Sequence, residues 1–239
     1  GTDKETLPDF LTAKGYDQEG ALIEMSVSEP MQARPSELCG SGIKIDENCA
    51  SNSPGIFAAG DASDQMGCLH MCTTGGFAAG KSAAAYAASV SRRPPLGVRA
   101  VEKERKRILR PLQINQGTQY NEFENIIRIV ATDHFGPVKT EMSLTTALQK
   151  FDRMDAELDR LKAGNMHELM RCHEAMNIHK VAKIMASAAL ARRESRFAPY
   201  HYRADFTETD DENFCGLIAV SKGADGRPTT RFERLEYDV

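Results

Sequence analysis

One stretch near the N-terminal end constrains the fold most, because it predicts a strand, a sharp turn, a loop and a helix in succession. The apolar residues 56–59 end at Gly60-Asp61, as a buried strand does when its last residue faces a ligand. Gly75-Gly76 then open an alanine-rich helix expected over residues 76–90. Glycines let a backbone approach a ligand closely, and a helix start offers unpaired N–H groups to an anion. A carboxylate at a strand end beside such a helix is typical of a nucleotide-cofactor crevice.

A second interpretation of this stretch is left open. Residues 75–82 have the spacing G-x-x-x-x-G-K-S of the phosphate-binding loop in nucleoside triphosphatases. That loop must lie between a strand and a helix. Residues 66–74 make a poor strand, since they contain a glycine, two cysteines and two threonines, and the residues that follow already have a helical composition. Loss of ATP binding on Lys81→Ala would favour this alternative.

Two motifs more than a hundred residues apart identify a family when they are taken together. The first is PGIFAAGD at 54–61 with GGFAAGKSAA at 75–84. The second is RESR at 193–196, HYRADF at 201–206 and DDENF at 210–214. The first resembles the closing segment of the FAD-binding domain in the succinate dehydrogenase and fumarate reductase flavoprotein family, and the second resembles the C-terminal signature of that family. The resemblance covers most of residues 30–239.

The residues before the glycine pair separate subgroups of this family. Its dicarboxylate enzymes have an arginine for the substrate carboxylate two residues before the Gly-Gly pair, and Thr73 has that position here. Residues 70–81, HMCTTGGFAAGK, are more similar to the alpha subunit of adenylylsulfate reductase, a flavoprotein that works on sulfite and AMP. The resemblance therefore favours a sulfur enzyme over a fumarate or succinate enzyme.

The resemblance also implies a site, with FAD as the cofactor and no metal ligand. The residues expected to bind the cofactor are Gly60, Asp61, Thr73, Thr74, Gly75, Gly76 and Phe77. The residues expected to act in or support catalysis are His70, Arg196, His201 and Arg203. N–H groups at a helix start beside the flavin would raise its reduction potential. The alternatives are a turn aspartate at position 61, a surface histidine at position 70, and an internal salt-bridge network of the arginines with Glu194 and Asp205.

One expected partner follows from a cofactor-binding motif that the sequence lacks. An FAD domain of this type begins with G-x-G-x-x-G after its first strand. No such pattern occurs, and CGSGI at 39–43 opens no helix. We therefore expect the C-terminal part of a flavoprotein that holds FAD weakly by itself and joins an N-terminal portion carrying G-x-G-x-x-G. The resemblance also implies a ferredoxin-like iron–sulfur protein as the electron-transfer partner.

Composition excludes other classes. The chain has 239 residues and a net charge of −4, which argues against a nucleic-acid partner. No apolar run approaches the roughly 18 residues of a membrane span. Six scattered cysteines include one close pair, Cys68 and Cys72, and lack the second pair of a zinc or cluster site. Free thiols in a reducing cytoplasm are the expected state.

The expected fold class is α/β plus α, a Rossmann-like closing segment followed by a helical bundle and a β-hairpin. We assign 1–36 to a remnant of a capping or linker region, 37–93 to the FAD-binding domain, 94–196 to a helical domain and 197–239 to a C-terminal extension. Shorter elements are a helix at 4–14, strands at 21–27, 37–50 and 55–59, and a hairpin pairing 214–221 with 229–237. The prolines at 94 and 95 mark a boundary.

Residues 98–193 carry helical periodicity, and capping residues divide them. Thr140 is a predicted N-cap, and Asn165 with Glu168 forms a predicted capping box. Two antiparallel helices are the simplest packing. The second helix is expected to face the core with residues spaced by three and four, namely Leu169, Met170, His173, Met176, Val181, Ile184, Met185 and Ala188.

The basic segment 92–110 has two interpretations. It holds many lysines and arginines but few glutamates, and could dock an acidic iron–sulfur protein. A solvated helix face is the simpler interpretation. For the whole chain we favour part of an FAD oxidoreductase that passes electrons to an iron–sulfur protein. A P-loop triphosphatase and a non-catalytic assembly chain are the alternatives.

Overall fold

The computed structural model describes residues 12, 15, 42–64, 68–91, 97–196 and 201–234. It divides the chain into two units, Gly1–Arg34 and Pro35–Val239. In the first unit Thr12 is helical, and Gly15 ends that turn with a φ of 74° and an N–H that donates to the Thr12 carbonyl. The remainder of the expected helix at 4–14 and the whole strand at 21–27 lie outside the described residues.

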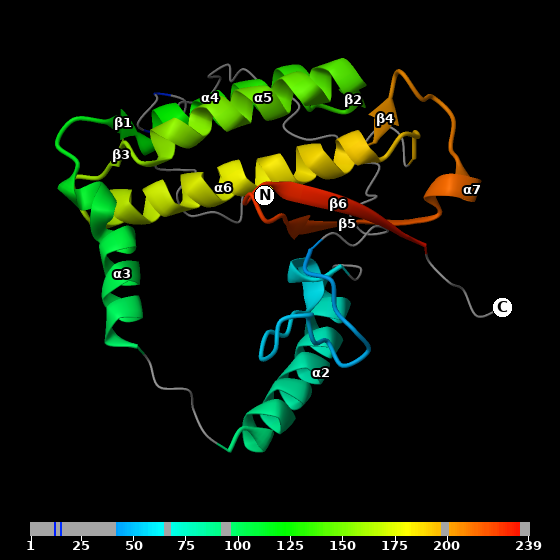
Figure 1. The fold of residues 1–239 in the computed structure, drawn as a ribbon, viewed down its shortest axis with the longest axis horizontal. Coiled ribbons are helices and arrows are strands. Elements are labelled where there is room, and N and C mark those ends of the chain that lie inside the picture. Colours follow the sequence, from blue (N-terminus) through cyan, green and yellow to red (C-terminus); the bar gives the residue numbers. More distant parts are fainter. Residues whose placement is uncertain are drawn as a thin grey trace. The chain divides into compact units, whose positions relative to one another are not determined.

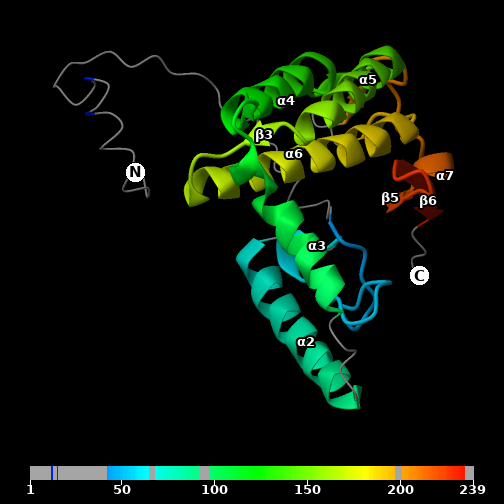
Figure 2. The same ribbon diagram turned by 60° about the vertical axis from the view of Figure 1, so that its left-hand side comes forward.

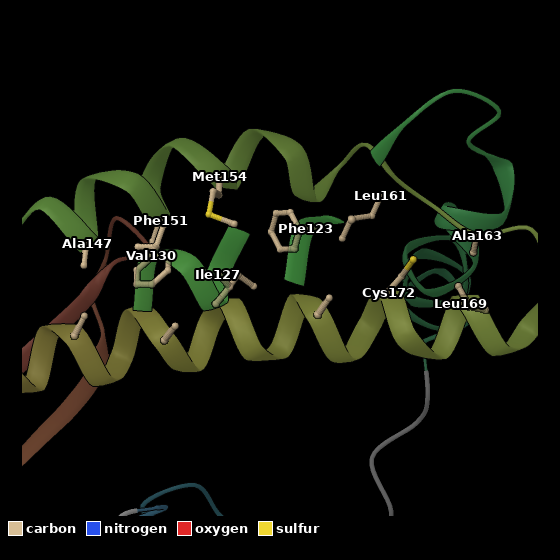
Figure 3. Close-up of a cluster of buried hydrophobic side chains, with 13 residues drawn as sticks. Phe123, Ile127, Val130, Ala147, Phe151, Met154, Leu161, Ala163, Leu169 and Cys172 are labelled. Atoms are coloured by element: carbon tan, nitrogen blue, oxygen red, sulfur yellow. The ribbon is translucent and has the colours of Figure 1, made fainter. Parts of the chain in front are cut away.

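Three long helices in the second unit pack together as a bundle (Figure 1). They are α4 (Tyr120–His134), α5 (Glu141–Leu158) and α6 (Met166–Ala191), and each packs against the other two. Figure 3 shows their shared core, in which Phe123 and Phe151 are at most 1% exposed. Burying such a ring stabilises a fold by about 1.5–3 kcal/mol. The predicted helical domain is therefore a bundle of three helices, in which α4 packs against the expected pair, α5 and α6.

The predicted helix starts are confirmed. The Thr140 hydroxyl accepts from the Ser143 N–H at 3.1 Å, and the Ser143 hydroxyl accepts from the Thr140 N–H at 2.9 Å. The Asn165 side chain accepts from the Glu168 N–H at 2.9 Å, which confirms the N-cap half of the predicted capping box. The Glu168 carboxylate accepts from the Gly164 N–H at 2.7 Å, one residue before the donor that a capping box uses. These oxygens satisfy backbone donors that the first turns of α5 and α6 leave unpaired.

The predicted core face of α6 is confirmed at Leu169, which is buried, and is wrong in the second half of the helix and at Met170. Met170, Val181, Ile184 and Met185 are 39–52% exposed. The other buried residues of α6 form a neighbouring stripe of mainly small side chains, namely Cys172, Ala175, His179, Ala182, Ala186 and Ala189. Because apolar residues are distributed around α6 and do not gather on one face, periodicity alone cannot select its core side. Small side chains at these positions let α4 and α5 approach closely.

Short strands tie the loops of the bundle together. Strand β1 (Thr118–Gln119) pairs in parallel with β3 (Leu161–Lys162), and β2 (Val138–Lys139) pairs in parallel with β4 (Tyr202–Arg203). Strand β5 (Gly216–Lys222) is antiparallel to β6 (Pro228–Arg234), and both pack against α6. This hairpin confirms the one expected at the C-terminal end.

The expected strand at 55–59 is wrong. Residues 42–64 form turns, with isolated bridges between Ala50 and Phe57 and between Ile43 and Ser63. They end in the short helix η3 (Gly60–Ala62), which contacts α2 (Cys68–Ser89). A strand needs neighbouring strands for its hydrogen bonds. The described part of the chain supplies only single bridges here, so a Rossmann-like sheet does not form within it.

The helix α3 (Val98–Leu109) continues into η4 (Arg110–Gln113), which contacts β3 and α6 (Figure 2). None of the α3 residues is buried. The last helix, α7 (Asp211–Phe214), precedes the hairpin. Among the described helices, none combines the length and the apolar character that a membrane crossing requires.

Candidate functional site

A close contact between η3 and α2 brings the two halves of the first motif together. Gly60 has a φ of 59°, a conformation that glycine adopts without strain. A Cβ at Gly60 would lie 2.5 Å from the Cys72 sulfur, so this position has no room for a side chain. On the same side of α2, a Cβ at Gly75 would lie 3.7 Å from the Gly60 nitrogen. The first motif therefore packs glycine against glycine.

Asp61 follows Gly60 and is exposed. Within the described residues its carboxylate forms no hydrogen bond or ion pair. The turn that carries it is nevertheless fixed, because the buried Ser63 donates from both its N–H (2.9 Å) and its hydroxyl (2.8 Å) to the Gly60 carbonyl. A fixed turn that presents a free carboxylate suits the binding of hydroxyl groups.

The expected start of the helix is wrong. Helix α2 begins at Cys68, so Gly75, Gly76 and Phe77 lie well inside it. Interior N–H groups bond to the carbonyl four residues earlier and are not available to an anion. The continuous helix also excludes an open phosphate-binding loop at residues 75–82.

The other residues expected near the cofactor lie on α2 as well. His70 is an exposed helical residue and does not lie in a loop. The Thr73 and Thr74 hydroxyls donate to the carbonyls of Leu69 and His70 at 2.7 and 2.9 Å. Phe77 is 79% exposed, and a Cβ at Gly76 would meet nothing within 4 Å. Spacings of three and four place Thr73, Gly76 and Phe77 on one open face of α2.

The second motif forms an ionic cluster in which Arg203 is fully buried. Its Nε and Nη2 donate to the two Asp205 oxygens at 2.9 Å each. Its Nη1 donates to the carbonyls of Ala189 (3.0 Å), Leu190 (3.3 Å) and Arg192 (2.8 Å). These carbonyls lie at the C-terminal end of α6, where a cation is favoured by the helix dipole.

Asp205 connects this arginine to another helix. Its Oδ2 accepts from the N–H of Glu141, the first residue of α5, at 2.7 Å. The Arg203 guanidinium and this N–H hold the Asp205 pKa at about 2, below its ordinary value. The Arg203–Asp205 pair thus links the end of α6 to the start of α5, with each charge at the helix end that its sign favours.

Glu194 is the centre of the remaining ion pairs. It is fully buried, and Arg196 donates to its two oxygens at 2.7 and 2.9 Å. Arg192 also pairs with Glu194, and the Asp210 N–H donates to it at 2.8 Å. Burial alone would raise the pKa of this carboxyl, but these donors lower it. The internal salt-bridge network suggested by the sequence is therefore present.

Lys139 lies beside this network in β2, and His201 directly precedes β4, the strand that pairs with β2. The His201 Nε2 is buried and has no hydrogen-bond partner among the described residues. Burial and the nearby charges of Lys139, Arg192 and Arg203 lower its pKa to about 4. Burial and Arg203 lower the pKa of Lys139 to about 8. Lys139 belongs to no sequence motif and Arg192 directly precedes one, so neither residue was predicted to belong to this cluster.

The neutral buried His201 predicts a loss of stability in acid. Its pKa is about 4 when folded and about 6.5 when unfolded, so the unfolded state binds more protons between these values. The free energy of unfolding should fall by about 2–3 kcal/mol as the pH drops from 6.5 to 4, allowing for the partial exposure of the ring. Urea unfolding across this range measures the loss. In His201→Gln the free energy of unfolding should depend less steeply on pH. Some dependence should remain, because burial also lowers the pKa of His179. An unchanged slope would contradict the assignment.

Comparison with known proteins gives a consistent result. A family described as fumarate reductase flavoprotein C-term matches residues 125–239. An uncharacterised FAD-dependent oxidoreductase of Methanocaldococcus jannaschii is 32% identical over 223 residues, which are 88% of this chain and 39% of that protein. The fumarate reductase flavoprotein subunit of Escherichia coli is 26% identical over 89% of this chain and 38% of its own. The adenylylsulfate reductase alpha subunit of Megalodesulfovibrio gigas is 26% identical over 40% of this chain and 14% of its own.

Solved structures share the fold. An E. coli quinol fumarate reductase FrdA variant has a TM-score of 0.72 at 22% identity, covering 81% of this chain and 36% of its own. An adenosine-5-phosphosulfate reductase in complex with sulfite has a TM-score of 0.73 at 20% identity, covering 80% and 33%. The chain spans about two fifths of the length of the first relatives.

Proposed function

The chain belongs, through residues 125–239, to the fumarate reductase flavoprotein family, and from this premise we propose that it is the C-terminal part of an FAD-dependent oxidoreductase subunit. The observation that carries the proposal is the joint occurrence of two motifs, one forming the Gly60–Gly75 contact and the other the Arg203–Asp205 link. In this proposal the remaining flavoprotein portion completes the FAD site, and an iron–sulfur protein exchanges electrons with it.

The described residues fit part of a flavin site. Bound FAD would supply the capacity to accept and release electrons. Asp61 presents an exposed carboxylate that can accept hydrogen bonds from the hydroxyl groups of the cofactor. The open face of α2 carries Gly76, which leaves room for close approach, and Phe77, whose exposed ring can cover an apolar surface. Thr73 supplies no cation for a substrate carboxylate, which favours a substrate other than a dicarboxylate.

We assign a positioning role to the second motif. The Arg203 donors are directed to Asp205 and to the end of α6, and the Arg196 side chain binds Glu194 and Asp211. A substrate anion would have to displace these internal partners. We therefore propose that Arg196, His201 and Arg203 support the site by fixing the segment 192–214. Of the residues first considered catalytic, His70 alone is an exposed side chain on α2 and remains a candidate for contact with substrate.

Flavin binding by the assembled flavoprotein tests this proposal. The complex should show a flavin absorbance spectrum that dithionite bleaches. Asp61→Ala should weaken FAD binding by about tenfold or more, because hydrogen bonds to a charged group contribute about 1.5–3 kcal/mol. Asp133→Ala, which removes an exposed carboxylate on α4, is the matched control and should leave the FAD content unchanged.

Three results would count against the proposal. A wild-type complex without flavin would favour a non-catalytic assembly chain. ATP binding that depends on Lys81 would favour a triphosphatase. Unchanged FAD affinity in the Asp61→Ala variant would remove the assigned role of that carboxylate.

A further inference from the structure

The helix α3 lacks the packing that normally stabilises a helix of its length. Its 12 residues include no buried side chain. Isolated helices shorter than about 12–15 residues are marginal in water, and tertiary packing of an apolar face supplies most helical stability in proteins. Within the described residues α3 is held at its C-terminal end, where the His173 Nε2 lies 2.9 Å from the Ile108 carbonyl oxygen and Arg110 pairs with Asp159.

One face of α3 carries cations without partners. Arg99, Lys103 and Lys106 follow one another at intervals of four and three residues, so they share a face. Within the described part of the chain none of the three forms an ion pair. By contrast, Arg107 pairs with Glu104, and the Arg105 guanidinium lies 3.8 Å from Glu102. In the described structure the positive charge of this face is thus available to an outside carboxylate.

Another face of α3 is apolar and exposed. Val98, Val101 and Ile108 are 77%, 46% and 39% exposed and lie on one side of the helix. A surface with an apolar strip beside a charged strip has the composition of a small protein–protein interface. In such an interface, opposite charges speed the association of the two proteins, and the apolar contact stabilises the complex.

We propose that α3 is the docking surface for the iron–sulfur protein, with an acidic surface of that protein facing Arg99, Lys103 and Lys106. The proposal rests on the proposed function and adds the location and the charge of the interface. Electron-transfer encounters bury small areas and depend on charge complementarity. A helix of this size, with three cations that no described residue pairs with, meets both requirements.

An anionic membrane surface or a nucleic acid fits α3 less well. Arg105 lies between Val101 and Ile108 on the apolar face, so insertion of this face into lipid would also bury the arginine. Glu102 and Glu104 interrupt the positive charge, and the net charge of the whole chain is −4. A protein surface can place a donor opposite each of these carboxylates, whereas a polyanion has only negative charge to face them.

Binding of an acidic ferredoxin with two [4Fe–4S] clusters to the full chain tests the surface. At about 20 mM salt we expect binding that weakens as salt is added. Lys103→Glu with Lys106→Glu should weaken it by about tenfold. Arg153→Glu with Lys180→Glu reverses two exposed cations on α5 and α6, and this control should change the affinity less than about twofold. Carbodiimide coupling should join Lys103 or Lys106 to ferredoxin carboxylates, detected as cross-linked peptides.

The outcomes separate this proposal from the proposed function. Equal weakening by both double variants, cross-links elsewhere, or no ferredoxin binding would overturn the docking surface. Sedimentation with phosphatidylglycerol vesicles that depends on Lys103 and Lys106, without ferredoxin binding, would overturn it in favour of a membrane contact. The FAD content of the assembled flavoprotein should be the same in the α3 variants and the wild type. A wild type without FAD would instead contradict the proposed function.

Discussion

Replacing Arg203 by methionine should lower the free energy of unfolding by about 3–5 kcal/mol, the range measured when one partner of a buried ion pair is removed. Methionine fills similar space but donates no hydrogen bond. The carbonyls of Ala189 and Arg192 would lose their donor at the end of α6, and the Asp205 carboxylate would lose its cation. Chemical unfolding, followed by far-ultraviolet circular dichroism, measures the change.

Two further variants make the Arg203 prediction specific. Arg203→Lys keeps the charge but cannot form the two parallel bonds to Asp205 while also reaching α6. We expect it to be intermediate in stability. Arg153→Met removes an exposed arginine from α5 and should leave the unfolding midpoint almost unchanged. If Arg203→Met unfolded at the same denaturant concentration as Arg153→Met, the linking role of this residue would be wrong.

Local signals in the sequence predicted local structure well. The cap at Thr140 and the hairpin near the C-terminus depend on residues a few positions apart, and both are confirmed. The two motifs also identified the family, because fumarate reductase flavoproteins and an adenylylsulfate reductase alpha subunit are among the relatives. Short patterns are reliable where neighbouring residues supply the decisive contacts.

The wrong predictions concern contacts between distant residues. Residues 55–59 have the composition of a strand but lack neighbouring strands in the described chain, so they form only a single bridge, at Phe57. The sequence could not show which side of α6 faces the core, because the apolar residues of this helix are spread around its axis. Lys139 was missed because its proximity to Arg203 results from pairing between β2 and β4, which no sequence spacing reveals.

The site was predictable only where its residues lie close together in the sequence. The sequence correctly grouped Glu194, Arg196, Arg203 and Asp205, since they lie within a dozen residues of one another. It could not indicate that Asp205 accepts from the Glu141 N–H, a bond between residues 64 positions apart. That bond changes the interpretation of the motif, because it makes the Arg203–Asp205 pair a link between helix ends.

Replacement of Glu194 by glutamine should have the second large effect. The variant keeps the shape of the side chain but removes the charge that neutralises Arg192 and Arg196. Its amide nitrogen would also face guanidinium groups that are themselves donors. We expect a loss of about 3 kcal/mol in the free energy of unfolding, within the range for a broken buried pair. Urea unfolding at neutral pH measures this loss.

The matched control is Glu104→Gln on α3, which removes a carboxylate from an exposed pair with Arg107. Solvent screens that pair, so its loss should not shift the unfolding midpoint measurably. The pH dependence distinguishes charge from shape. Because Glu194 has a lowered pKa, wild type should lose its advantage over Glu194→Gln as the pH falls below the ordinary glutamate pKa. An advantage that stayed constant from neutral pH into this acid range would show that the Glu194 charge does not stabilise the fold.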